Sequence, residues 1–200
     1  MGCQPHQGAG YFEVADKKVQ EFYTEKYGVV HPTKAGLKIP EIFDAAINKD
    51  VKALWIIGED IVQTDPNSNH VIEAMNSLEL LVVQEIFMSE TAKLATVVLP
   101  GTTFLEKDGT FTNTERRIQR VNRAAEPLTG TKPDGVIVTD MMQKLGFNKP
   151  DYDADQVLAE IADVVPFFKG VTRERLGKLG LQWPVPVSYT HLTLPTRYRV

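Results

Sequence analysis

The chain has 200 residues, an ordinary globular composition of 42% hydrophobic and 24% charged residues, and a formal net charge of −4. This length is enough for one domain with its own core. The acidic balance argues against a general nucleic-acid binder, which needs a basic surface to neutralise phosphates. No apolar run approaches the roughly 20 residues of a membrane-spanning helix. We therefore expect no nucleic-acid partner and no membrane span.

Cysteine and histidine usage gives no sign of a metal site. The only cysteine is Cys3, and one thiol can neither form an intrachain disulfide nor hold an iron–sulfur cluster or a structural zinc. The four histidines are scattered without metal-ligand spacing; they are His6, His31, His70 and His191. The first residues lack the basic and apolar regions of a signal peptide. The cytoplasm is the default compartment that these features favour.

The first quarter of the chain predicts an irregular opening followed by two helices. Residues 1–12 are rich in Gly, Pro and Gln, which favour irregular structure. The segment 14–28 spaces its apolar residues with a helical period and stops at Gly28. The segment 39–50 places Pro40 in the first helical turn, before an apolar stripe.

Residues 51–100 read as strand, helix, strand, helix, strand. The apolar runs are VKALWII, LLVV and TVVLP, and they are continuous rather than alternating. Such runs are typical of parallel strands buried on both faces. Asp65 or Asn67 could cap the first of the two helices, and Ser89 could cap the second. We therefore predict a Rossmann-like parallel sheet with helices on both faces.

The rest of the chain predicts a short hairpin and further helices. Asp108-Gly109 is a turn signal between two short strands, and helices are expected over 133–147 and 153–166. The fold class is α/β, with a helical C-terminal appendage. The predicted division is an opening segment with helices at 1–50, a nucleotide-binding domain at 51–147, a helical extension at 148–186 and a tail at 187–200.

Polar residues follow each strand of the predicted sheet. In open α/β sheets, ligands bind outside the carboxyl ends of the strands. Carboxylates there can accept hydrogen bonds from a ribose diol or a guanine base, and N–H groups near Ser89–Thr91 suit a pyrophosphate. The alternative is that these carboxylates are solvated loop charges. The three clusters are Gly58-Glu59-Asp60, Gln84-Glu85 and Pro100-Gly101.

Other charged residues have two interpretations each. Lys107 could place a cation over a phosphate, or it could be an ordinary turn lysine. Asp134 is most simply a first-turn helix acid favoured by the helix dipole. The charged run Glu115, Arg116, Arg117 and Arg120 fits a solvated face or an interdomain ion-pair strip. No catalytic set is evident, so these patterns alone predict a nucleotide-type binding domain without a catalytic centre.

Several stretches resemble the large subunit of molybdopterin-dependent formate dehydrogenases. They are GEDIVQTDPN, LELLVVQEIFMSETAKLATVVLPGTTFLEKDGTFTNTERRIQRV, the opening MGCQPHQGAGY and the late GKLGLQWPVP, in the family's order and spacing. The resemblance spans about residues 1–186. These sequence motifs are far more specific than those that a generic Rossmann-like sheet would share by chance.

The resemblance implies a cofactor and its contacts. Large subunits of this family carry two molybdopterin guanine dinucleotides that clasp one molybdenum or tungsten, and the matching region holds one of them. The cofactor positions carried onto this sequence are Gly58, Glu59, Asp60, Gln84, Glu85, Lys107 and Asp134. Most of them coincide with the strand ends chosen from the sheet rule.

The resemblance also implies that the chain is a fragment. The family's iron–sulfur cysteines, its metal-ligating Cys or selenocysteine and its catalytic residues all lie upstream of the matched region. We expect the isolated chain to be inactive on formate and to need the rest of the large subunit and an electron-acceptor subunit or ferredoxin. Residues 187–200 match no part of the family, and we predict a non-native, poorly packed tail.

Three rival functions stay open at this point. The iron–sulfur subunit of respiratory complex I shares this architecture and can lack the pterin, which would make the domain structural. Another molybdopterin oxidoreductase, such as nitrate reductase, is a second rival, because the substrate is decided mainly upstream. A plain structural module without a ligand is the third.

Overall fold

A computed structural model describes residues 4–185 of the chain, and it confirms the α/β class. The chain forms two compact units with separate cores. The first unit comprises residues 1–107 and 124–151, and the second comprises 108–123 and 152–200. The hairpin expected inside the 51–147 domain thus groups with the C-terminal segment. The predictions about Cys3 and the tail at 187–200 lie outside the described residues.

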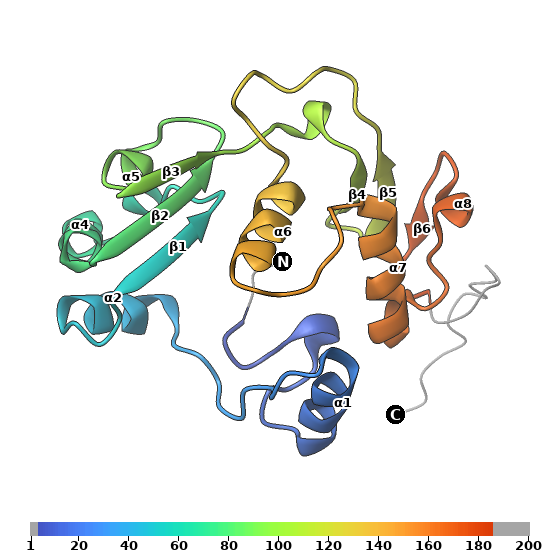
Figure 1. Cartoon of the computed structure of the whole chain (residues 1–200), viewed down its shortest axis with the longest axis horizontal. Coiled ribbons are helices and arrows are strands. Elements are labelled where there is room, and N and C mark those ends of the chain that lie inside the picture. Colours follow the sequence, from blue (N-terminus) through green and yellow to red (C-terminus); the bar gives the residue numbers. More distant parts are fainter. Residues whose placement is uncertain (1–3, 186–200) are drawn as a thin grey trace. The chain divides into compact units, whose positions relative to one another are not determined.

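The first unit contains the predicted parallel sheet (Figure 1). Its strands are β1 (Ala53–Ile57), β2 (Leu80–Glu85) and β3 (Val97–Pro100). The order is β1-β2-β3, and both neighbouring pairs run parallel. Ile57 pairs with Gln84, and Glu85 pairs with Pro100, so all three strands end at the same edge.

The helices of the first unit begin and end largely where the local sequence signals predict. They are α1 (Lys17–Tyr27), α2 (Ile39–Ile47), α3 (Ile61–Thr64), α4 (Ser68–Ser77), α5 (Glu90–Lys93) and α6 (Asp134–Lys144), with 3-10 turns η1 (Ala9–Tyr11) and η2 (Phe104–Glu106). The side chains of Asn67 and Ser89 cap α4 and α5, and Gly28 ends α1 in the left-handed region. The short α3 and the two 3-10 turns were not predicted, because a single turn shows no helical period and α3 lacks the side-chain cap that marks α5.

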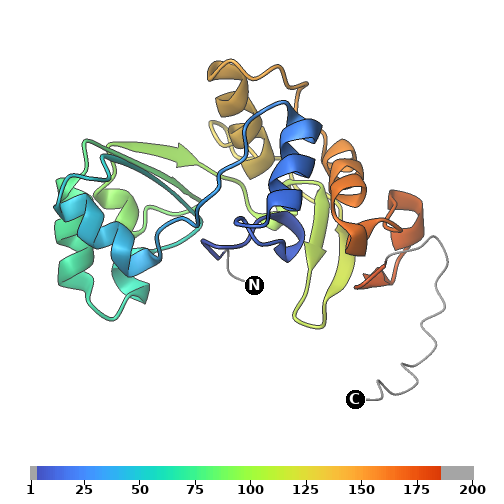
Figure 2. The ribbon, with the colours of Figure 1, turned by 90° about the horizontal axis from the view of Figure 1, so that it is seen from below.

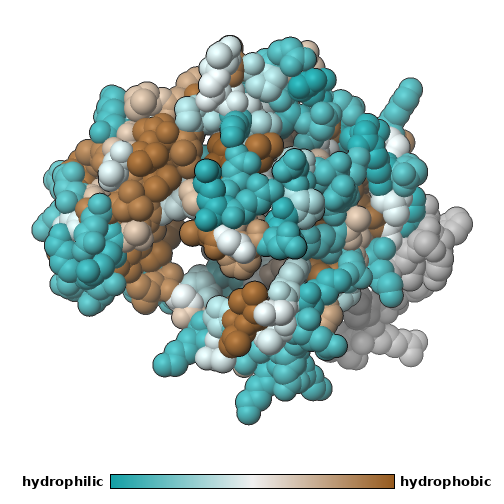
Figure 3. Space-filling view, in the orientation of Figure 1, coloured by the Kyte–Doolittle hydropathy of each residue, from teal (hydrophilic) through white to brown (hydrophobic). Residues whose placement is uncertain are grey.

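The core of the first unit lies on one face of this sheet. Leu81 and Val83 are at most 1% exposed and pack against residues of α2, α4 and α5, namely Phe43, Ala46, Val71, Ala74, Met75 and Ala92. Figure 2 shows these helices on one side of the strands. On the other face, Ile57, Leu80 and Val97 are 40–50% exposed. Hydrophobic atoms are visible over this part of the surface in Figure 3.

The second unit combines an antiparallel sheet with two helices. Its elements are β4 (Gly109–Thr112), β5 (Arg117–Val121), α7 (Ala154–Val164), the 3-10 turn η3 (Pro166–Phe168), α8 (Arg173–Leu176) and β6 (Leu181–Gln182). The strand order is β4-β5-β6. Its core is formed by Ile118, Leu158, Val171, Leu176, Leu181 and Val185.

The hairpin turn of the second unit does not lie at Asp108-Gly109, so its predicted position was wrong. Gly109 is the first residue of β4, and the turn falls between Asn113 and Arg116. The Asn113 side chain accepts a hydrogen bond from the backbone N–H of Arg117, and Arg116 takes a positive φ of 63°. An Asn that bonds to the backbone ahead of it closes the turn without glycine.

Replacing Gly180 by alanine is expected to destabilise the second unit. Gly180 has a φ of +73°, and a Cβ there would overlap the carbonyl oxygen of Ile118. Gly177 is the matched control, because its φ is +48° but its Cβ would meet open space. Gly177→Ala should lower the unfolding free energy by about 1–3 kcal/mol. Gly180→Ala should cost roughly 1–3 kcal/mol more, since β5 and β6 must move apart. Urea unfolding measures both, and equal losses would contradict the overlap.

Candidate functional site

All the site residues predicted from the sequence lie in the first unit, around the carboxyl edge of its sheet. The ends of β1 and β2 are joined where Gly58 donates its backbone N–H to the carbonyl oxygen of Gln84, at 2.9 Å. Gly58 has a φ of +62°, a conformation that favours glycine. Glu59 and Asp60 therefore follow β1 directly beside the end of β2. The sheet rule correctly located these two segments next to each other.

Three residues far apart in the sequence meet at the end of β2. Gln84 is 1% exposed, and its Nε2 donates to Asp134 Oδ1 at 2.8 Å. The ammonium group of Lys107 forms an ion pair with the other oxygen, Oδ2. Because a carboxylate can only accept, the amide of Gln84 must turn its nitrogen toward Asp134. The structure thus brings together Gln84, Lys107 and Asp134, three of the residues that the family resemblance named as cofactor contacts.

These contacts set the charge state of Asp134. Burial alone would raise the pKa of this carboxyl, but hydrogen bonds from Lys107 and Gln84, together with the positive charge of Lys107, outweigh it. The pKa of Asp134 is therefore held below its ordinary value. The group is an ion at neutral pH, and it fixes the first turn of α6 to the sheet edge.

A glycine allows this close approach. A Cβ at Gly101 would lie 3.3 Å from Asp134 Oδ1, which is tighter than ordinary side-chain packing. The backbone N–H of Gly101 donates to the carbonyl oxygen of Glu85 at 3.0 Å, and Gly101 forms a parallel bridge with Lys132. The Pro-Gly at the end of β3 therefore provides the space in which α6 meets the sheet.

Asp60 faces inward rather than toward solvent. Its Oδ1 accepts hydrogen bonds from the N–H and the hydroxyl of Thr91, at 3.0 and 2.7 Å. Its Oδ2 accepts from Gln63 Nε2 at 2.6 Å and from the N–H of Glu90 at 3.4 Å. Burial raises the pKa of Asp60, but these hydrogen bonds outweigh that effect and lower it. The N–H groups that the sequence suggested for a pyrophosphate are thus already bound by the chain's own carboxylate.

Glu59 and Glu85 keep more of their acceptor capacity. One oxygen of Glu59 accepts from the Thr64 hydroxyl at 2.5 Å. One oxygen of Glu85 accepts from the next backbone N–H, that of Ile86, at 2.7 Å. Within the part of the chain that the structure describes, the second oxygen of each carboxylate makes no hydrogen bond. These two glutamates are therefore the groups at the edge best able to receive a ligand's donors.

Two buried threonines at this edge were missed by sequence reasoning. Thr91 is fully buried and binds Asp60, whereas Thr102 is 2% exposed and follows the Pro-Gly pair. Among residues 4–185, Thr102 Oγ1 and Gln84 Oε1 are buried without a hydrogen-bonding partner. Buried polar atoms are rarely left unpaired in folded proteins, so such a pair suits a site completed by a bound polar group. The only sequence signal for these two threonines was the position of each one next to a strand end or a helix cap.

Two negative findings apply to the described residues. No three His, Cys, Asp or Glu side chains between residues 4 and 185 converge closely enough to hold a metal ion. None of the helices in that range has the length and the apolar character needed to cross a lipid bilayer.

Comparison with known proteins defines the class of the chain. The sequence profile of the molybdopterin oxidoreductases matches residues 9–144. The chain therefore belongs to the molybdopterin oxidoreductase family, and its relatives include formate dehydrogenase alpha subunits.

The relatives are much longer than this chain. A putative formate dehydrogenase of Staphylococcus haemolyticus is 42% identical over 99% of this chain and 20% of its own length. A formate dehydrogenase alpha subunit of Methanococcus maripaludis is 42% identical over 92% of this chain and 27% of its own length. The chain thus spans about a fifth to a quarter of these curated relatives.

A solved structure shares the fold. Acetylene hydratase from Pelobacter acetylenicus superimposes with a TM-score of 0.57 over 78% of this chain and 22% of that chain, at 21% identity. This likeness concerns the fold alone. It agrees with the mixed α/β architecture and its parallel sheet.

Replacing Asp134 by asparagine should lower the free energy of unfolding at neutral pH and make that free energy depend less on pH in acid. The carboxylate stabilises the folded state above its unfolded pKa of about 3.9, and this contribution is lost as the pH falls through its lower folded pKa. Hydrogen bonds to charged groups contribute roughly 1.5–3 kcal/mol, which we reduce to about 1 kcal/mol because the Asp134 side chain is 41% exposed. Urea unfolding at neutral pH and near pH 3 measures the difference, which should shrink in acid.

Asp140→Asn is the control for this substitution. Asp140 also lies on α6 and pairs with Lys132 at 2.6 Å, but the lysine side chain of that pair is 59% exposed. Exposed ion pairs stabilise little, so the control should change the unfolding free energy by less than Asp134→Asn. A pH-independent loss in Asp134→Asn would show that its charge is not what stabilises the edge.

Proposed function

We propose that this chain is the part of a formate dehydrogenase catalytic subunit that binds a molybdopterin guanine dinucleotide. The observation that carries the proposal is the meeting of Gln84, Lys107 and Asp134 at the carboxyl end of β2, with a buried acceptor left over on Gln84. Family membership and the identity to formate dehydrogenases support the same assignment.

The residues at the edge fit a guanosine group chemically. Glu59 and Glu85 each retain a carboxylate oxygen that can accept from the N–H groups of guanine or the hydroxyls of ribose. Lys107 adds a cation at the end of β2, although Asp134 already balances its charge. Asp60 acts indirectly in this proposal. Three of its side-chain hydrogen bonds, to Glu90 and Thr91, hold the start of α5 against the end of β1, and the fourth goes to Gln63.

The contribution of this chain to catalysis is binding and orientation. When bound, the cofactor supplies the molybdenum or tungsten centre that takes two electrons from formate in the complete enzyme. Glu85 and Gln84 would fix the nucleotide end of that cofactor, and Gly58 would let the backbone approach it closely. The whole protein's iron–sulfur cluster and its electron-acceptor subunit or ferredoxin belong to the same proposal.

A second candidate is a pterin-free structural domain, as in the iron–sulfur subunit of complex I. One observation favours it: both Asp60 and Asp134 are bonded within the chain, so the edge is partly complete without a ligand. On this alternative, Glu59 and Glu85 would be solvated charges. Guanine nucleotide released from the purified complete subunit separates the two functions.

The test is Glu85→Ala in the complete subunit. Among the described residues, the side chain of Glu85 bonds only to the backbone N–H of Ile86, so removing that side chain should not unfold the edge. We expect at least about tenfold weaker retention of guanine dinucleotide, since one charge-assisted hydrogen bond contributes roughly 1.5–3 kcal/mol. Guanine nucleotide released by acid denaturation, per polypeptide, measures retention.

Glu73→Ala is the matched control, because Glu73 is an exposed acid on α4 away from the edge. It should retain the full amount of nucleotide. Unchanged retention in Glu85→Ala would place the pocket elsewhere. A wild-type subunit without any guanine nucleotide would favour the structural alternative.

A further inference from the structure

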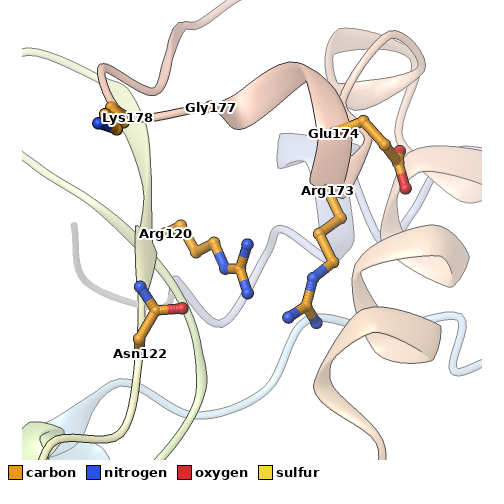
Figure 4. Close-up of a pocket in the computed structure, with 6 residues that line it drawn as sticks. All are labelled: Arg120, Asn122, Arg173, Glu174, Gly177 and Lys178. Carbon is orange, nitrogen blue, oxygen red and sulfur yellow. The ribbon is translucent and has the colours of Figure 1, made fainter.

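The second unit contains a hollow of about 560 Å³, and half of its lining residues are cationic. Its lining residues are Arg120, Asn122, Arg173, Glu174, Gly177 and Lys178. The hollow shares no residue with the carboxyl edge of the parallel sheet. In Figure 4 the side chains of Arg120 and Arg173 both reach into the same space, whereas the Glu174 carboxylate points away from it. The inward-facing charge is therefore positive.

Core packing brings the two arginines together. Ile118 and Arg120 are two residues apart on β5, so they lie on the same face of the strand. Arg173 and Leu176 are three apart on α8, so they lie on the same side of that helix. Ile118 and Leu176 are each 1% exposed and belong to one core cluster. Their packing therefore sets Arg173 beside Arg120.

The charges of the hollow are only partly balanced. Arg173 pairs with Asp155, but a guanidinium has five N–H donors and can serve a second anion. Within the described residues, the Arg120 and Lys178 side chains form neither an ion pair nor a hydrogen bond. Two like charges in the same space repel each other, and an anion bound between them would be attracted to both.

We propose that this hollow binds the phosphoryl group of a small phosphate ester. Two planar guanidinium groups that reach into one space match a tetrahedral oxyanion, because each can bind two of its oxygens. Asn122, the residue after the end of β5, adds an amide donor to the lining. A bound water occupies about 30 Å³ of liquid volume, so the hollow has room for the organic part of an ester as well.

The site is tested by titrating the full chain with three probes: inorganic phosphate, phenyl phosphate and succinate. Isothermal calorimetry at constant ionic strength should show phenyl phosphate binding more tightly than inorganic phosphate, and both more tightly than succinate. Arg120→Gln should weaken phosphate binding by about tenfold, because one charge-assisted contact is lost. The phosphate affinity of Arg120→Lys should lie between those of the wild type and Arg120→Gln, since lysine keeps the positive charge but not the planar, bidentate guanidinium group.

Lys169→Gln is the control, because Lys169 is an exposed cation of the same unit that does not line the hollow. It removes the same charge and should leave binding unchanged. Urea unfolding of each variant verifies that the unit remains folded. Equal weakening by Lys169→Gln and Arg120→Gln would show only general charge attraction and overturn the site. Equal affinity for succinate and phosphate would overturn the phosphoryl assignment. Tighter binding of inorganic phosphate than of phenyl phosphate would overturn the ester.

Discussion

The carboxylate of Asp134 is the contact on which the proposed site depends. It joins the first turn of α6 to the middle strand of the parallel sheet through Gln84, and it holds Lys107 through an ion pair. These three residues come from segments separated by 23 to 50 positions, and Gly101 provides the space for them to meet. The edge of the sheet exists as a shaped surface because this one acid is ionised and fully bonded.

Asp60 plays a similar part on the neighbouring strand end. Its two oxygens accept hydrogen bonds from Thr91 and Glu90 at the start of α5, so the turn after β1 is linked to the short helix after β2. The edge therefore contains two kinds of acid. The aspartates are used inside the chain, and Glu59 and Glu85 remain able to bind other groups. The shorter aspartate side chains bond within the edge, and the longer glutamate side chains extend beyond it.

Sequence patterns predicted much of the fold because the signals were local. Ser89 and Asn67 cap their helices as expected, and the continuous apolar runs form the parallel strands. The hairpin was misplaced because Asp108-Gly109 carries the stronger turn signal, although the side chain of Asn113 closes the actual turn.

The site was harder to predict, because its contacts join distant parts of the chain. The family resemblance named Gln84 and Asp134 as cofactor contacts, but the hydrogen bond between them was not predicted, since no spacing rule spans 50 residues. The inward role of Asp60 depends on Thr91, whose burial no local signal shows. Side-chain direction and burial are decided by packing, which the sequence does not display.

The position of β2 in the middle of the sheet has one more consequence. Val83 lies in the core, and Gln84 is the very next residue, on the opposite side of the strand. A strand is stiff over two residues, so the depth at which valine seats among its neighbours also sets how far the glutamine amide projects. The packing of Val83 in the core therefore also determines where the Gln84 amide can form hydrogen bonds, and a change at one residue will affect the other.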